Sequence, residues 1–227
     1  GTRFAVEAYL QTLPPQGREA VAQALKAYRS EPQDPHPVDP SRLVYGSADA
    51  PVHITEWIDI RCPHCRHMEE NLEQMTDATP PGVWSWELHQ FPLDGACNPV
   101  VPRSAGGISC LAAKMMICLR ASPRTNSLRR DLFQHQQELT DDRLWQMAAP
   151  QADQRSALRS CVDDPATQAM LQSDIRTAMA YHITGTPLVM VNGREAENIP
   201  AFIYSLILAK GDPNDPGYRV LSGPPPS

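Results

Sequence analysis

The chain has 227 residues, a length typical of one large domain or of a domain with an appendage, because domains average roughly 150 residues. A formal net charge of −6 argues against a protein that binds the phosphates of nucleic acid. The longest near-continuous apolar stretch, Ala201–Ala209, has about 9 residues, whereas a membrane-spanning helix needs about 20. Composition therefore predicts a soluble globular protein.

Residues 1–44 are predicted to form an N-terminal helical extension and a proline-rich linker. Apolar residues recur three or four positions apart on both sides of Leu13-Pro14-Pro15, which breaks the pattern into two short helices. Four prolines between Glu31 and Arg42 then prevent a helix and favour an extended connector.

The next segment, residues 45–211, alternates strand and helix patterns. Val52–Ile58 predicts a strand, Cys62–Met75 a helix and Trp84–Phe91 a second strand. A helical insertion at about residues 98–180 follows. Its four expected helices cover Leu111–Arg120, Leu128–Leu139, Gln151–Val162 and Ala166–Tyr181.

After the insertion the strand pattern returns. Leu188–Asn192 predicts a strand, Asn192-Gly193 a type I′ hairpin turn, and Arg194–Ala196 the returning strand. A last helix begins near Asn198 and ends before Gly211. This order predicts an α/β fold with one interrupted sheet. The prolines of the tail, residues 212–227, predict disorder or a tether.

The motif Cys62-Pro63-His64-Cys65 directly follows a predicted strand and opens a helix, a context that favours a redox-active pair. Unpaired N–H groups and the macrodipole of the first turn stabilise a thiolate on Cys62, and Pro63 fits the first helical position. The imidazole of His64 is expected to add a hydrogen bond or a positive charge. Because a stabilised thiolate favours the reduced form, the pair is expected to donate its disulfide.

The alternative for this motif is half of a zinc site, with His64 or His67 as further ligands. A structural zinc site normally needs a second close pair of ligands, and no other cysteines form one. The remaining candidate histidines have no partner at ligand spacing; they are His53, His89, His135 and His182. We therefore expect no metal and no cofactor, and a metal-binding module stays open as an alternative of another class.

Glu56 lies on the face of its strand that Ile54 and Ile58 make apolar, six residues before Cys62. A buried acid is costly unless it is used, so we expect Glu56 to accept or relay the proton of Cys65. The alternative is a register shifted by one residue, which would leave Glu56 in solvent.

Thr186-Pro187 stands at the head of an apolar strand and follows Gly185, which predicts a cis peptide bond. Such a bond would bring the backbone of Thr186 against the Cys62 sulfur, ready to pair with an extended substrate chain. The dipeptide alone is weak evidence among 23 prolines, and the cysteine pair strengthens it.

Together, Val52–Trp57 before the cysteine motif and Thr184–Pro187 ahead of Val191-Asn192-Gly193 resemble the DsbA-type thiol–disulfide oxidoreductases of the thioredoxin superfamily. The resemblance covers roughly Tyr45 to Lys210. It implies a thioredoxin fold with an inserted helical domain. The N-terminal helices lie outside the resemblance and are expected to form an extension of this fold. It also implies a nucleophilic Cys62, a resolving Cys65, a buried acid at Glu56 and a cis bond before Pro187.

A narrower similarity rests on Phe91–Asp94, Cys97-Asn98, Cys110–Ala113 and Cys118. These segments are similar to DsbA-like domains that are fused to, or work with, bacterial vitamin K epoxide reductase homologues. This similarity implies that a quinone-reducing membrane protein reoxidises Cys62 and Cys65.

The expected function is that of a dithiol oxidase that acts on reduced or unfolded exported proteins, with no nucleic-acid partner. The expected location is periplasmic or otherwise extracytoplasmic. Since no basic and apolar leader opens the sequence, we expect an export signal or membrane anchor to have been removed or to lie outside it. The alternative is a disulfide isomerase or reductase held reduced, for which the N-terminal helices would serve as a dimerising segment.

Four of the six cysteines remain for structural disulfides, which an oxidising compartment favours. In a helix, Cys110 and Cys118 would be about 12 Å apart along the axis, beyond the roughly 7 Å that a disulfide spans between Cα atoms. Of the two remaining connectivities we prefer Cys97 with Cys110 and Cys118 with Cys161. The alternative is that some are free cysteines packed as small apolar residues.

Overall fold

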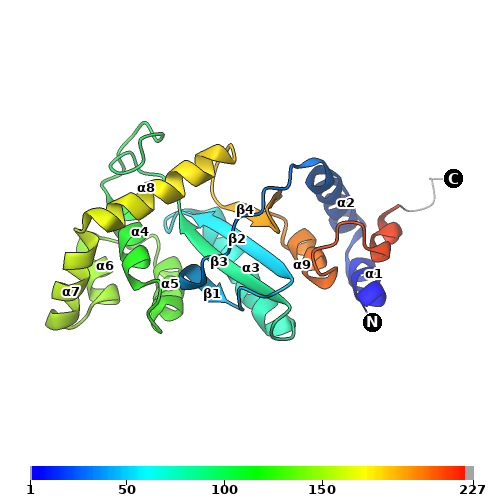
Figure 1. Cartoon of the computed structure of the whole chain (residues 1–227), viewed down its shortest axis with the longest axis horizontal. Coiled ribbons are helices and arrows are strands. Elements are labelled where there is room, and N and C mark those ends of the chain that lie inside the picture. Colours follow the sequence, from blue (N-terminus) through cyan, green and yellow to red (C-terminus); the bar gives the residue numbers. More distant parts are fainter. Residues whose placement is uncertain (1, 223–227) are drawn as a thin grey trace.

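A computed structural model describes residues 2–222 and places a five-stranded sheet at the centre of the molecule, with helices packed around it (Figure 1). The strand order is β1-β3-β2-β4-β5. Strands β2 and β3 are parallel, and the other neighbours are antiparallel. The strands are β1 (Leu43–Tyr45), β2 (Val52–Ile58), β3 (Trp84–Gln90), β4 (Leu188–Val191) and β5 (Arg194–Ala196).

The register of β2 and β3 decides which side chains share a face of the sheet. Thr55 pairs with Glu87 and Trp57 with His89, whereas Glu56 pairs with Leu88. Paired residues project from the same face and successive residues from opposite faces. Glu56 and His89 therefore lie on opposite sides of the sheet.

In the part of the chain that the structure describes, the α-helices outside the insertion are α1 (Thr2–Thr12), α2 (Pro15–Ser30), α3 (Pro63–Ala78) and α9 (Pro200–Leu208). The insertion between β3 and β4 contains α4 (Ile108–Leu119), α5 (Thr125–Gln134), α6 (Asp141–Ala148), α7 (Ala152–Val162) and α8 (Pro165–Ala180). In Figure 1 these five helices lie together at one end of the molecule, and α1, α2 and α9 lie at the other.

The sequence predicted four helices in the insertion, and the structure has a fifth, α6, which the prediction missed. Its signal is present in the sequence: the side chain of Thr140 accepts a hydrogen bond from the backbone N–H of Arg143, and two aspartates occupy the first turn. Helix α5 also ends earlier than expected, at Gln134. The short strand β1, in the expected linker, was missed as well.

The N-terminal helices belong to the main hydrophobic core. Val6, Leu10 and Val21 are fully buried in the same cluster as residues of β4 and α9. The hydroxyl of Tyr28 donates a hydrogen bond of 2.7 Å to the carbonyl oxygen of Val191. These buried residues of α1 and α2 are therefore part of the core of the same chain.

The expectation of a disordered or tethering tail was wrong for residues 212–222. A 3₁₀ turn at Pro216–Leu221 packs against α1, and Tyr218 is buried with its hydroxyl 3.0 Å from that of Ser205. The packing is close, since a Cβ added to Gly217 would lie 2.7 Å from the Cβ of Val6. Residues 223–227 of the expected tail lie outside the described residues.

Two disulfides join parts of the insertion, with the pairing preferred from the sequence. Cys97 bonds to Cys110 across 13 residues, and Cys118 in α4 bonds to Cys161 in α7 across 43 residues. Cys62 and Cys65 are free thiols. Within residues 2–222, no helix is both long enough and apolar enough to cross a bilayer.

If α1 belongs to the core, Leu10→Ala should lower the free energy of unfolding by about 2–5 kcal/mol, the usual cost of emptying a buried leucine site. Urea unfolding followed by circular dichroism measures this cost. The exposed neighbour Gln11→Ala is the control and should stay within about 0.5 kcal/mol of the wild type. A Leu10→Ala variant as stable as the control would contradict the assignment of α1 to the core.

The two disulfides should differ in their contribution to stability. Loop-closure entropy predicts a loss of about 4 kcal/mol for Cys118→Ser/Cys161→Ser and about 3 kcal/mol for Cys97→Ser/Cys110→Ser, because the first pair closes the longer loop. Both variants are compared in denaturant with Cys62 and Cys65 in the same redox state. The reverse order of the two losses would show that loop length is not the deciding quantity.

Candidate functional site

The candidate site lies where β2 ends and α3 begins. Cys62 is the residue that caps α3 and Pro63 is its first helical residue, so the unpaired N–H groups of the first turn face the Cys62 sulfur. Cys62 is 7% exposed, whereas Cys65, one turn into the helix, is fully buried. Only Cys62 is thus within reach of another molecule.

The two thiols have opposite electrostatic environments. Hydrogen bonds lower the pKa of Cys62 to about 5; the largest contribution comes from the Cys65 thiol, followed by Thr186 and the backbone N–H groups of Cys65 and His64, while burial opposes them. Burial is the main cause that raises the pKa of Cys65 far above its usual range. At neutral pH the site therefore holds a thiolate on Cys62 and a neutral thiol on Cys65.

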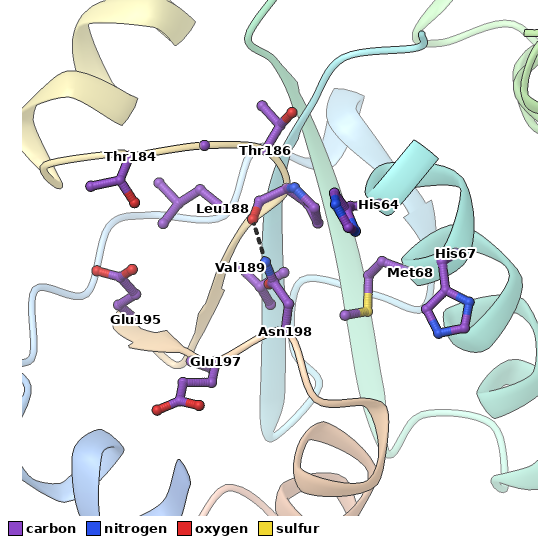
Figure 2. A pocket seen from close by; sticks show the side chains of 13 residues that line it. His64, His67, Met68, Thr184, Thr186, Leu188, Val189, Glu195, Glu197 and Asn198 are labelled. Carbon is purple, nitrogen blue, oxygen red and sulfur yellow. Dashed lines mark hydrogen bonds between the residues drawn. The ribbon is translucent and has the colours of Figure 1, made fainter. Parts of the chain in front are cut away.

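The backbone N–H of His64 is one of the groups that lower the pKa of Cys62. The imidazole ring of His64 is exposed and lines a neighbouring cavity (Figure 2). The position of His64 in the first helical turn thus explains its effect on the sulfur.

The loop before β4 meets the same sulfur. The Thr186–Pro187 bond is cis, and the Sγ of Cys62 lies 3.4 Å from the carbonyl oxygen of Thr186. Asn198 donates a hydrogen bond of 2.7 Å to the carbonyl oxygen of Pro187, drawn as the dashed line in Figure 2. Residues more than a hundred positions apart thereby form one surface around Cys62.

Two cavities share this loop as part of their wall. One, of about 420 Å³, lies between the α3 side chains His64 and His67 and the two glutamates Glu195 and Glu197 (Figure 2). The other, of about 530 Å³, includes Cys62 itself in its lining. The reactive sulfur thus opens onto a hollowed surface.

Glu56 lies on the buried face of β2 and is fully inaccessible to solvent. Its Oε2 accepts a hydrogen bond of 3.0 Å from the indole N–H of Trp86, and its Oε1 has no hydrogen-bond partner among residues 2–222. Burial, and after it the carboxylate of Glu69, raises the pKa of Glu56 to about 8. A carboxyl group with this pKa can both take and give a proton near neutral pH.

A buried arginine from the insertion balances the acids beneath the cysteines. The Nε of Arg129 in α5 lies 2.8 Å from a carboxylate oxygen of Glu69, and its guanidinium stacks 4.4 Å from the ring centre of Trp86. Arg129 also pairs with Glu73, which reaches solvent. The sequence carried no signal for this network, because its members come from α3, β3 and α5.

Asp59, which sequence analysis did not single out, ties the cysteine loop to two other segments. Its Oδ1 accepts hydrogen bonds from the backbone N–H of Arg61 at 2.9 Å and from the hydroxyl of Ser109 at 2.8 Å. Its Oδ2 accepts one from the backbone N–H of Leu93 at 2.8 Å. An aspartate directly after a strand is a common turn signal, and this signal could have found it.

Gln136 is a second residue that sequence analysis missed. Its Nε2 donates hydrogen bonds to the carbonyl oxygens of Ile60 at 3.0 Å and Cys62 at 3.2 Å. Gln136 lies two residues past the end of α5 at Gln134. Since its partners lie 74 and 76 residues away, no local pattern could reveal it.

Comparison with known protein families shows the family to which the chain belongs. The family model described as Thioredoxin matches residues 39–202, most of the chain. The chain belongs to the thioredoxin family. No curated protein matches the chain.

Solved structures show which form of the thioredoxin fold this family member has. BdbD from Bacillus subtilis, in its oxidised form, matches with a TM-score of 0.62 at 18% identity, over 79% of this chain and 97% of that one. DsbA from Pseudomonas aeruginosa matches with a TM-score of 0.53 at 20% identity, over 79% and 86%. The thioredoxin-family chain therefore has a DsbA-like fold.

The buried acid predicts a pH dependence of stability. The folded protein keeps the proton of Glu56 up to about pH 8, whereas the unfolded chain releases it near 4.5. The native state therefore binds more protons over this range, so rising pH favours unfolding, by a total on the order of 5 kcal/mol. In the protein with Cys62 and Cys65 oxidised, Glu56→Gln should remove the fall in the free energy of unfolding that the ionisation of Glu56 causes as the pH rises.

The measurement is the free energy of unfolding between pH 4 and 9, taken in denaturant. Glu70→Gln, at an exposed glutamate on α3, serves as the control and should keep the wild-type profile. Identical profiles for wild type and Glu56→Gln would mean that Glu56 has an ordinary pKa.

Proposed function

We propose that this protein is a thiol–disulfide oxidoreductase that works as a dithiol oxidase and donates the Cys62–Cys65 disulfide to exported proteins. The observation that carries the proposal is the contrast between the two thiols: Cys62 has a pKa of about 5 and lines a cavity, whereas Cys65 is fully inaccessible and has a raised pKa. A stable Cys62 thiolate favours the reduced form and makes the disulfide a stronger oxidant.

The reaction starts from the oxidised protein. A thiolate of the substrate attacks the Cys62 sulfur, the Cys62–Cys65 bond breaks, and a mixed disulfide forms between substrate and Cys62. Cys65 leaves as a thiolate and takes a proton, for which the carboxyl group of Glu56 is the proposed source. A second substrate thiolate then attacks the substrate sulfur of the mixed disulfide and releases Cys62 as a thiolate. The substrate loses two electrons, and the cysteine pair gains them.

The loop at Thr186-Pro187 is the proposed docking surface for the substrate backbone. It borders both cavities, one of which contains Cys62 in its lining. An extended chain that crosses this loop would place its cysteine beside Cys62, the member of the pair that lines a cavity. Reduced or unfolded proteins offer such extended segments, which supports them as the substrate class.

The reduced pair must be reoxidised for a second cycle. We propose a quinone-linked membrane protein of the vitamin K epoxide reductase type as the acceptor of the two electrons, and a periplasmic or other extracytoplasmic location. The sequence similarity around Cys97 and Cys110 supports this partner, and the two structural disulfides support an oxidising compartment.

The reduction potential of the Cys62–Cys65 pair tests the direction of the reaction. Equilibration with glutathione should place it near the value of DsbA, about −120 mV, and not near that of thioredoxin, about −270 mV. The oxidised protein should also oxidise reduced, unfolded ribonuclease. A thioredoxin-like potential would favour the reductase or isomerase alternative. Stoichiometric metal bound to the cysteine motif, without oxidase activity, would favour a metal-binding module.

Removal of Cys65 should trap the intermediate. Without its thiol, Cys65→Ser should keep a mixed disulfide on Cys62 after reaction with a disulfide-bonded peptide, because no neighbouring sulfur remains to resolve it. Mass spectrometry of the unreduced protein detects the adduct. Cys62→Ser is the matched control and should form none, since the remaining thiol is buried. Equal adducts on both variants would contradict the assigned roles.

A further inference from the structure

A second cluster of chemistry-bearing side chains lies on the face of the sheet opposite Glu56. His36, from the connector after α2, and Glu87 and His89, from β3, each offer one ligand atom, and these atoms lie within 4.8 Å of one another. The expectation that His89 has no partner at ligand spacing was wrong. The register of β3 places His89 beside Glu87, and the connector brings His36 to them.

The ring of His89 is held firmly by its surroundings. Its Nε2 lies 2.7 Å from Oε1 of Glu87, and its Nδ1 lies 3.0 Å from Oδ1 of Asp174 in α8. The indole of Trp57 stacks on it, with ring centres 4.9 Å apart. A carboxylate on the second nitrogen of a histidine is the usual support of a metal-bound imidazole, because it orients the ring and raises its basicity.

His36 contributes the observation that points to a missing partner. Its Nδ1 is shielded from solvent and has no hydrogen-bond partner among residues 2–222. Among the described residues, its ring forms one hydrogen bond, a long one of 3.4 Å between Nε2 and the hydroxyl of Thr55. The residue belongs to an extended connector and not to a helix or strand, so its ring can move the short distance that would bring all three ligands onto one ion.

The charges around the cluster suit a divalent cation. Glu87 and Asp174 are buried acids, and Arg42 pairs with Asp174 at 2.9 Å. The carboxylate of Glu87 lies 2.7 Å from the ring of His89 and accepts a hydrogen bond of 3.4 Å from the backbone N–H of Asp39, so its side-chain partner is an imidazole and not an arginine or lysine. A buried carboxylate that faces imidazoles is costly unless it is paired or coordinates a metal.

We propose that His36, Glu87 and His89 form a site for a divalent transition metal, with zinc as the preferred ion. Zinc is bound in some proteins by two histidines and one carboxylate, with a water molecule as the fourth ligand. Asp174 and Trp57 hold His89 in place without touching the ion. The bound metal would link the connector that follows α2 to strand β3, on the face of the sheet opposite Glu56. We therefore expect the metal to affect the stability of the protein and not the thiol reaction.

The test uses the full chain with Cys62 and Cys65 oxidised to a disulfide, so that neither thiol can bind metal. After treatment with a chelator, titration calorimetry with zinc chloride should show one ion per chain, and zinc should raise the melting temperature. Cobalt in place of zinc should give the visible absorption of a four-coordinate site. The variant Asp174→Asn should weaken zinc binding about 10–100-fold, as expected for a residue that supports a ligand.

The decisive variant is His36→Ala, because this residue lies on a connector and its loss should leave the fold intact, as circular dichroism would verify. It should abolish zinc binding and the rise in melting temperature. His135→Ala is the matched control, since His135 also lies near a carboxylate, 3.7 Å from that of Glu138, but on the exposed surface. It should bind zinc as the wild type does.

Three results would overturn the proposal. They are the absence of stoichiometric zinc binding by the oxidised wild type, unchanged binding by His36→Ala, and loss of binding in Cys62→Ser/Cys65→Ser. The last result would place the ion at the cysteine motif. None of them bears on the proposed oxidase reaction, which is measured separately with ribonuclease as substrate.

Discussion

The burial of strand β2 on both faces is the constraint on which the rest of the structure depends. Hydrogen-bonded to β3 on one side and β4 on the other, it presents Glu56 to one layer and Trp57 to the opposite layer. Its end delivers Cys62 to the first turn of α3. A shift of one residue would exchange the two faces and place the acid away from the cysteines. The thiol site and the histidine cluster therefore share one register.

The helical insertion is part of the site as well as a cover for the sheet. Arg129 pairs with Glu69 beneath the cysteines, Gln136 binds the loop that carries Cys62, and Ser109 bonds to Asp59. The pairing of Arg129 with Glu69 offsets part of the cost of burying acids beneath the cysteines. Two disulfides hold the helices that supply these groups.

Patterns of local origin predicted much of this architecture. The strand Val52–Ile58 follows from its alternating and apolar residues, and its predicted bounds agree with those of β2. The hairpin at Asn192-Gly193 follows from its turn chemistry, and both residues have positive φ. The prediction of a disordered tail was wrong because it rested on proline content alone. In the structure, Tyr218 packs against Ser205 and Gly217 packs against Val6, and these long-range contacts order the segment.

By itself, the sequence indicated the cysteine pair, because a Cys-Pro-His-Cys motif between strand and helix places Cys62 at the first turn of the helix. It also determined Glu56, since strand periodicity alone sets the face on which a side chain lies. Only the tertiary structure decided that Gln136 and Arg129 serve this site and that His36 meets His89. These contacts join residues far apart in the chain, and packing, rather than local periodicity, brings them together.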